Sequence, residues 1–233
     1  IQGRVPLAVS EPYALWYNPL TGETCRAHLT ADGLDVSRRS GESRILICRH
    51  TAWAGESEWI LSDRSIDLTD NRWQLSFIED QPTVYETFSL DGVQTWEGLN
   101  QATAITMGTG VYETTFQLSP ADAARSWAID LGDVRESARV YLNDTYVGCA
   151  WAVPFVLDCQ QALREGPNSL RIEVTNLPAN RIADLDRKGV AWRKMKEINV
   201  VNLHYEKSSY AGWEPVASGL NGKVRLISKT QRK

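Results

Sequence analysis

Tryptophan and hydrogen-bonding side chains gather in stretches of the sequence that do not alternate like strands. The chain has 9 Trp against 4 Phe. An indole ring packs on the flat C–H face of a sugar, while Asp, Asn, Arg and His hydrogen-bond its hydroxyls. The residue types therefore favour saccharide binding, with core packing of the indoles as the alternative. The Trp that lie in loop-like surroundings are Trp53, Trp59, Trp96, Trp151, Trp192 and Trp213.

The segment best equipped for such binding follows a predicted strand that ends near residue 175. There Asn180, Arg181 and Asp184 precede Trp192 and Arg193 in what we expect to be a long irregular connection, and loops on a rigid scaffold commonly carry function. A second polar and aromatic group lies nearer the C-terminus, and it could instead clamp the terminal segment onto a sheet. The predicted ligand-binding residues of both groups are Asn180, Arg181, Asp184, Trp192, Arg193, His204 and Trp213.

Catalytic and metal-binding signatures are missing from the sequence. It has no Gly-x-Ser-x-Gly elbow, phosphate loop or His-Glu-x-x-His, so we predict no catalytic residues. With 4 Cys, no Cys-x-x-Cys spacing and 3 His, a zinc site is not expected. Cys25 and Cys48 could bridge neighbouring strands or stay as free thiols. No cofactor is predicted, although Asp184 and Asp186 could help hold a structural calcium ion.

Composition narrows the classes of partner. The chain carries 25 Lys plus Arg against 29 Asp plus Glu, a net charge of -4, which gives no general attraction to nucleic acid or to anionic membranes. No run approaches the roughly 18 apolar residues that a membrane-spanning helix needs. The first ten residues lack the charged start and apolar core of an export signal, and we expect the chain to be part of a longer one.

Hydrophobic residues alternate with polar ones in most of the sequence, which predicts many short antiparallel strands in a sandwich or barrel. Turn formers separate the strands, and single helical turns are expected at 119–124 and 158–164, too short for parallel β-α-β units. A polar stretch at 62–70 suggests a boundary, so we predict a small β segment at 1–67 that packs on a main domain at 68–233. The alternating stretches are 25–29, 73–77, 112–118, 127–131, 138–142 and 170–174.

One long stretch, 110–180, resembles the sugar-binding jelly roll of glycoside hydrolases. The likeness rests on the strands at 111–116 and 126–131 and on the Gly-Asp-Val-Arg turn at 132–135 before a third strand. One departure is the hairpin turn, where Asn143 precedes Asp144 and the family usually has Asn-Gly. Further similar pieces are 154–158, 166–170 and 172–176, and weaker ones at 15–22, 176–184 and 215–224 extend the resemblance over nearly the whole chain.

Two groups of enzymes share this pattern. In β-galactosidase-like enzymes it is a flanking domain, and in large α-L-rhamnosidase-type enzymes, which we favour, a similar module follows the catalytic barrel. The resemblance implies an all-β fold, an antiparallel jelly-roll β-sandwich of galactose-binding-like type with a small additional N-terminal β segment. It also implies a periplasmic or extracellular location.

The implied function is that of a non-catalytic carbohydrate-binding or accessory region of a glycoside hydrolase that acts on plant or glycan polysaccharide. Its partners would be an oligosaccharide or polysaccharide and the catalytic domain of the same parent chain, with no nucleic acid and no membrane. Two alternatives stay open: a purely structural domain that braces or caps the catalytic barrel, and a part of the glycosidase active site.

Overall fold

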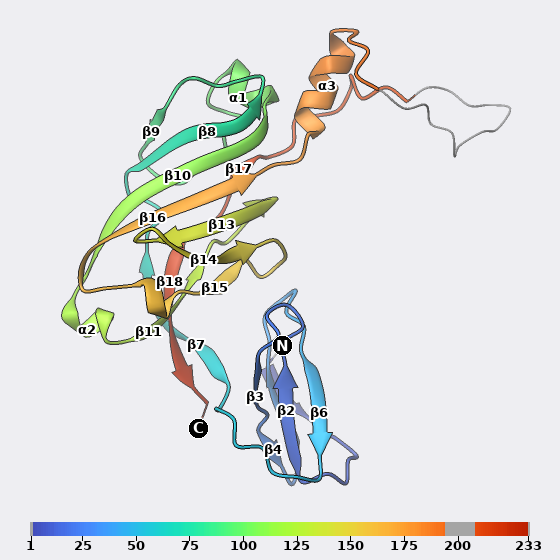
Figure 1. Ribbon diagram of the computed structural model, residues 1–233. Coiled ribbons are helices and arrows are strands. Elements are labelled where there is room, and N and C mark those ends of the chain that lie inside the picture. Colours follow the sequence, from blue (N-terminus) through green and yellow to red (C-terminus); the bar gives the residue numbers. More distant parts are fainter. Residues whose placement is uncertain (1, 194–207, 233) are drawn as a thin grey trace, which may run out of the picture.

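The computed structural model describes residues 2–193 and 208–232 (Figure 1). Within these residues the strands form five sheets, and every pairing between named strands is antiparallel. The predicted all-β sandwich is therefore confirmed. None of the helices in the described ranges is long and apolar enough to cross a membrane.

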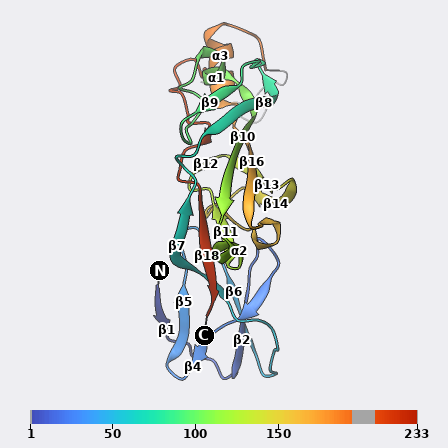
Figure 2. The same ribbon diagram turned by 90° about the vertical axis from the view of Figure 1, so that its left-hand side faces the viewer.

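The main sandwich consists of a six-stranded and a four-stranded sheet that share one core (Figures 1 and 2). In spatial order the larger sheet contains β14 (Thr145–Ala150), β13 (Ser137–Leu142), β16 (Gly166–Thr175), β10 (Met107–Leu118), β8 (Trp73–Gln81) and β9 (Phe88–Leu90). The smaller sheet contains β15 (Val156–Asp158), β11 (Ser126–Asp130), β18 (Arg225–Gln231) and β7 (Trp59–Asp67). A short pair, β12 (Val134–Arg135) with β17 (Gly219–Leu220), lies beside them.

The core is made by the alternating residues that the sequence indicates. Trp73, Tyr112 and Ile172 of the larger sheet are fully buried, as are Trp127 and Ile129 of the smaller one. Phe155 is buried in the same core. The prediction of a half-buried strand is wrong for β11, because Ala128 and Asp130 on its other face are buried too.

Loop residue Trp96 enters this core by packing directly on the backbone of β10. The ring is fully buried and lies edge-on to Phe77, with ring centroids 5.3 Å apart. Gly110 makes the approach possible, because a Cβ atom there would lie 2.2 Å from Cζ3 of the indole. Trp96 is thus a core residue, the alternative to ligand binding that its sequence context had left open.

The N-terminal part of the chain forms two three-stranded sheets of its own. A small core of Ala14, Trp16, Ala27 and Leu34 lies between them. The predicted strand at 25–29 is interrupted at residues 27–28, so that its two halves lie in different sheets. The strands are β1 (Gln2–Val5), β5 (Gly33–Ser37) and β4 (Leu29–Thr30) in one sheet, and β3 (Thr24–Arg26), β2 (Tyr13–Tyr17) and β6 (Ile45–Arg49) in the other.

Strand β7 affects the placement of the boundary between the N-terminal segment and the main sandwich. It precedes the predicted boundary at residue 67, yet it pairs with β18 from Trp59 to Asp67 and so belongs to the main sandwich by its hydrogen bonding. We propose a division just before Glu58, which leaves 2–57 as the N-terminal segment. The organisation as a small N-terminal β segment that packs on a main domain stays a prediction.

The expected helical turn after β10 is present as α2 (Pro120–Ala123). Its Ser119 side chain accepts a hydrogen bond from the Asp122 N–H, and Pro120 occupies the first turn, the combination from which the turn was predicted. A 3-10 turn at Gln160–Ala162 matches the second expectation. Helix α1 (Gln101–Ile105), capped by Asn100 and Thr103, was not expected, because its five residues are too few to show a period.

The hairpin between β13 and β14 turns through two residues in the left-handed region. Asn143 has φ 49° and Asp144 has φ 62°, as a type I′ turn requires at both central positions. The register, with Leu142 opposite Thr145, confirms a two-residue connection. The turn therefore keeps the geometry of the Asn-Gly hairpin although it carries Asp in place of Gly.

Asp144→Gly should raise the free energy of unfolding by about 0.5 kcal/mol. Glycine adopts positive φ without the steric cost that a Cβ imposes there, and this gain is partly offset by its greater freedom in the unfolded chain. Urea denaturation measures the change. Asp91→Gly, at a position without positive φ, is the control and should lower stability. A loss of stability in Asp144→Gly would contradict the interpretation.

All four cysteines are free thiols. Cys25 lies opposite Trp16 on one side of β2, and Cys48 lies opposite Ala14 on the other side. Two strand spacings, about 10 Å in total, separate the two cysteines, which is too far for a disulfide. The pKa of the Cys159 thiol is raised to about 12, chiefly by its burial.

Candidate functional site

The predicted binding segment is a helix and not an irregular connection. After β16 the chain enters α3 (Ala179–Arg187), which lies next to α1 beyond the end of the sandwich (Figures 1 and 2). Asp184 forms ion pairs with Arg181 and Lys188 one turn away on either side, and such pairs stabilise helices. Gly189, at φ 65°, follows the helix end as a typical C-terminal residue. Gly189 is the feature of the sequence that could have indicated a helix ending here, and the sequence analysis did not use it.

The first three predicted site residues hold the helix in place. The Asn180 side-chain amide donates to the Val216 carbonyl at 2.8 Å and accepts from the Val216 N–H at 2.9 Å, which ties α3 to the returning chain. The Asp184 carboxylate lies 2.9 Å from both the Arg181 guanidinium and the Lys188 ammonium. Asn180 and Asp184 are buried and engaged, so these groups serve the fold.

A second group forms around the carboxylate of Asp186. Trp192 Nε1–H donates to one oxygen at 2.6 Å, and the Tyr210 N–H donates to the other at 2.8 Å. The Arg193 guanidinium stacks 4.5 Å from the centre of the Trp192 ring and 5.2 Å from that of Tyr210. Tyr210 in turn contacts Trp213, with ring centroids 4.4 Å apart. The structure thus brings Trp192, Arg193 and Trp213 together around Tyr210. Asn180 is not part of this group.

Among these residues Trp213 offers the free aromatic surface. Its side chain is 49% exposed, whereas Trp192 and Arg193 are half-buried. Arg187 of α3 donates to the backbone carbonyls of Ala211 and Trp213, which fixes the loop that carries the ring. We call residues 177–193 and 208–218 the α3 arm. The predicted residue His204 lies outside the described residues.

The α3 arm does not assemble a calcium site. Asp184 faces two side-chain cations, and Asp186 accepts from an indole, a backbone amide and, at 3.7 Å, pairs with Arg193. Calcium prefers six to eight oxygen ligands, which these occupied carboxylates do not supply. Over residues 2–193 and 208–232 no group of three or more His, Cys, Asp or Glu could hold a metal ion.

A pocket of about 630 Å³ lies elsewhere, in the N-terminal segment, and was missed by the sequence analysis. It is an open pocket lined by the loop at 38–44, which joins β5 to β6, and by Trp16 and Val36. The sequence shows only a turn at Ser40-Gly41, so the repeated Arg and Ser of this loop were the unused signal. We call it the β5–β6 pocket.

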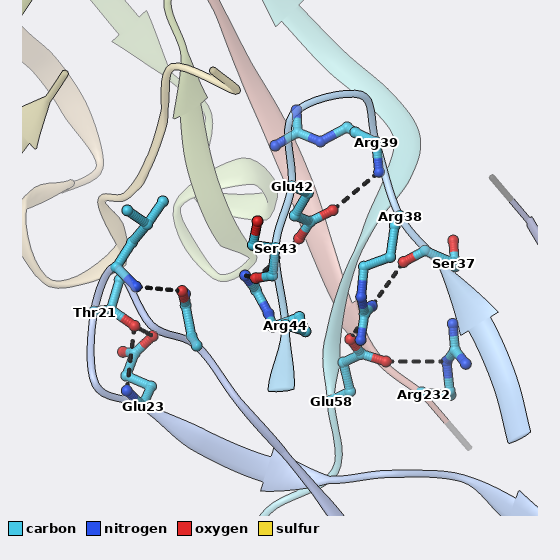
Figure 3. Close-up of polar contacts among 12 residues, drawn as sticks. Thr21, Glu23, Ser37, Arg38, Arg39, Glu42, Ser43, Arg44, Glu58 and Arg232 are labelled. Atoms are coloured by element: carbon cyan, nitrogen blue, oxygen red, sulfur yellow. Dashed lines mark hydrogen bonds and ion pairs between the residues drawn. The ribbon is translucent and has the colours of Figure 1, made fainter. Parts of the chain in front are cut away.

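Two buried carboxylates anchor this loop to the sandwich. Glu58 lies 2.5 Å from Arg38 and 3.6 Å from Arg232, and Figure 3 shows both guanidinium groups converging on it. Asp130 lies 3.8 Å from Arg39 and 3.1 Å from Arg225. Arg38 also stacks on Trp16, 4.4 Å from the ring centre. Consecutive arginines of one loop therefore reach separate acidic residues of the main sandwich.

The two antiparallel sheets around one core define a β-sandwich. Residues 96–217 match the model of the family described as glycosyl hydrolase 2 galactose-binding domain-like. This range is more than half of the 233 residues, and the chain belongs to that family. The resemblance seen in the sequence, to the galactose-binding-like region of a glycoside hydrolase, is confirmed.

Among known proteins, the chain is 30% identical over 173 residues to a Formosa agariphila protein named "Putative beta-glucuronidase", covering 66% of this chain and 15% of that protein. A rhamnosidase structure from Novosphingobium sp. PP1Y aligns with a TM-score of 0.70 at 24% identity, over 97% of this chain and 21% of that one. A Bifidobacterium dentium β-glucuronidase structure aligns with a TM-score of 0.49 at 19% identity, over 76% of this chain and 31% of that one. The chain thus spans less than a third of each of these proteins.

Proposed function

We propose that this chain is a non-catalytic, carbohydrate-binding accessory region of a glycoside hydrolase that acts on plant or glycan polysaccharide. Its ligand is an oligosaccharide or polysaccharide, and its other partner is the catalytic domain of the parent chain. The names of the similar proteins, a rhamnosidase and glucuronidases, support a glycosidase as the parent. A periplasmic or extracellular location, where such polysaccharides are found, belongs to the same proposal.

The observation that carries the proposal is the exposed ring of Trp213 on a braced loop. The ring contacts Tyr210, and its backbone is held by Arg187. The loop is therefore already ordered, and little conformational freedom is lost when a sugar stacks on the ring. Glu214 follows directly and is exposed, which supplies an acceptor for sugar hydroxyls beside the ring. An ordered aromatic platform with an adjoining polar group is the arrangement that saccharides use.

The buried carboxylates support a non-catalytic role. Glycoside hydrolysis needs two carboxyl groups across the scissile bond, one of them protonated. The acidic residues buried within the described chain each form ion pairs with arginine or lysine side chains, so their carboxylates are occupied by contacts within the chain. These residues are Glu58, Asp130, Glu173 and Asp184.

Titration with oligosaccharides tests the proposal. Intrinsic tryptophan fluorescence and calorimetry should show saturable binding to at least one member of a panel that contains rhamnose, galactose and uronic acid units. Trp213→Ala should weaken that binding by about tenfold, because stacking on an aromatic ring contributes about 1.5 kcal/mol. Trp59→Ala, which removes a ring that is 42% exposed on β7, is the matched control and should bind as the parent chain does.

A brace for the catalytic domain is the second candidate function. The α3 arm exposes apolar side chains besides Trp213, namely Leu177, Val190 and Val216, each more than 40% exposed. Such a patch suits packing against another domain. Two results together would favour the brace over saccharide binding. No oligosaccharide of the panel would bind to the chain, and the amides of Leu177–Val190 would be protected from hydrogen exchange only in the longer parent protein.

A further inference from the structure

The β5–β6 pocket has the size and the chemical lining of a small-ligand site. Its volume of about 630 Å³ falls within the range of roughly 300–1,000 Å³ typical of ligand pockets, and it is enough for a disaccharide. The indole of Trp16 and the side chain of Val36 form an apolar base, and the loop at 38–44 forms the polar walls. An apolar base with polar walls is suited to a sugar ring.

Arginine side chains outnumber carboxylates around this pocket. Glu58 and Asp130 are each shared by an arginine of the loop and an arginine near the C-terminus, and Glu42 faces Arg44 at 3.0 Å. The local charge is therefore positive, although the whole chain has a net charge of -4. The arginines concerned are Arg38, Arg39, Arg44, Arg225 and Arg232.

Two of the arginines keep donors for a ligand. Arg39 approaches Asp130 only to 3.8 Å, and its side chain is 39% exposed. Arg44 uses one nitrogen for Glu42 and one for the Ser43 carbonyl, and a guanidinium group has five N–H donors. Both side chains line the pocket, so an anionic group that enters it can be held by charge-assisted hydrogen bonds.

Neutral polar groups of the pocket complement the arginines. The hydroxyls of Ser40 and Ser43 are exposed and form no hydrogen bonds with the described residues. The Trp16 Nε1–H is buried without an acceptor in the described part of the chain, and such a donor in a native structure calls for a partner. These hydroxyl and indole N–H groups, together with the arginines, match the hydroxyl-rich rim of a saccharide.

We propose that the β5–β6 pocket binds an anionic saccharide, with Arg39 and Arg44 on its carboxylate or sulfate and Ser40 and Ser43 on its hydroxyls. This site is separate in sequence from the α3 arm, and the inference does not depend on saccharide binding by Trp213. It gives the N-terminal segment a ligand of its own, and it makes that ligand acidic.

Calorimetric titration of the 233-residue chain with three probes tests this inference. Digalacturonate carries carboxylates, neocarrabiose 4-sulfate carries a sulfate, and galactobiose is neutral. We expect saturable binding of at least one anionic probe, about tenfold weaker binding of galactobiose, and an affinity that falls with added salt. The two anionic probes distinguish a carboxylate ligand from a sulfate ligand.

Arg44→Gln should weaken binding of the anionic probe by about tenfold, the loss of one charge-assisted contact. Arg39→Gln should do the same, and urea denaturation of both variants shows whether they stay folded. Arg125→Gln, at an exposed arginine beyond β10, is the control and should leave the affinity unchanged. Trp213→Ala should also leave it unchanged, which separates this site from the α3 arm.

Three results would each overturn the inference. They are equal binding of all three probes, no binding of either anionic probe, and full affinity in folded Arg44→Gln.

Discussion

Glu58→Ala is expected to lower the free energy of unfolding by about 3–5 kcal/mol. The Glu58 carboxylate is 7% exposed and is shared by Arg38 and Arg232, whose side chains are only 10% and 17% exposed. Removal of the carboxylate takes away the counter-charge that two poorly hydrated guanidinium groups share. The loss of this buried ion pairing is the main part of the expected effect.

Urea denaturation, followed by tryptophan fluorescence and by far-UV circular dichroism, measures this effect. Glu56→Ala removes an exposed carboxylate two residues away and should change stability by no more than about 0.5 kcal/mol. If residues 2–57 fold as a unit of their own, the loss appears in a separate early transition. A change below about 1 kcal/mol in Glu58→Ala would show that the buried pair does not hold the N-terminal segment to the sandwich.

Gly110→Ala is the second substitution with a large expected effect, a loss of about 3 kcal/mol. A Cβ at this position would lie 2.2 Å from Cζ3 and 2.6 Å from Cε3 of Trp96. The ring has no room to retreat, since Trp96 is fully buried and packs against Phe77. The backbone of β10 or the indole must therefore shift. Overpacking of this kind typically costs about 1–3 kcal/mol, and this position lies at the upper end because both neighbours are fixed.

The midpoint of urea denaturation reports the loss of stability. The tryptophan emission spectrum of the chain should also shift as the Trp96 ring is displaced. Gly98→Ala is the matched control, because a Cβ there meets no atom within 4 Å. Adding Trp96→Leu to Gly110→Ala should recover part of the stability, because the two positions share one space. Native stability in Gly110→Ala would contradict the packing described for β10.

The local part of the fold could be predicted because it depends on neighbours in the sequence. Trp73 and Leu75 alternate with polar residues and are fully buried, and Ser119 with Pro120 starts a short helix as expected. The hairpin at Asn143 could be placed for the same reason. The central strand β11 was described less well, because its outer residue Asp130 is covered by Arg39, a residue 91 positions earlier in the chain.

The candidate sites depend on contacts that no local pattern encodes. Asn180 was singled out for its polar side chain, and its bonds go to Val216, 36 residues away. Arg38 and Glu58 meet only because the β5–β6 loop folds back on the start of β7. Trp213 was singled out for its indole ring, while its exposure follows from the way Arg187 and Tyr210 fix the loop.

The hydrogen bond that Arg232 donates has a consequence for how this region can be joined to others. Arg232 directly follows β18 and donates to the Asp35 carbonyl, and the Asp35 side chain pairs with Arg4 of β1, so the two ends of the described chain are linked through Asp35. Both ends of the ribbon lie in the half of the molecule away from α3 (Figures 1 and 2). Polypeptide attached at either end would leave from that half, at the end of the molecule opposite the α3 arm.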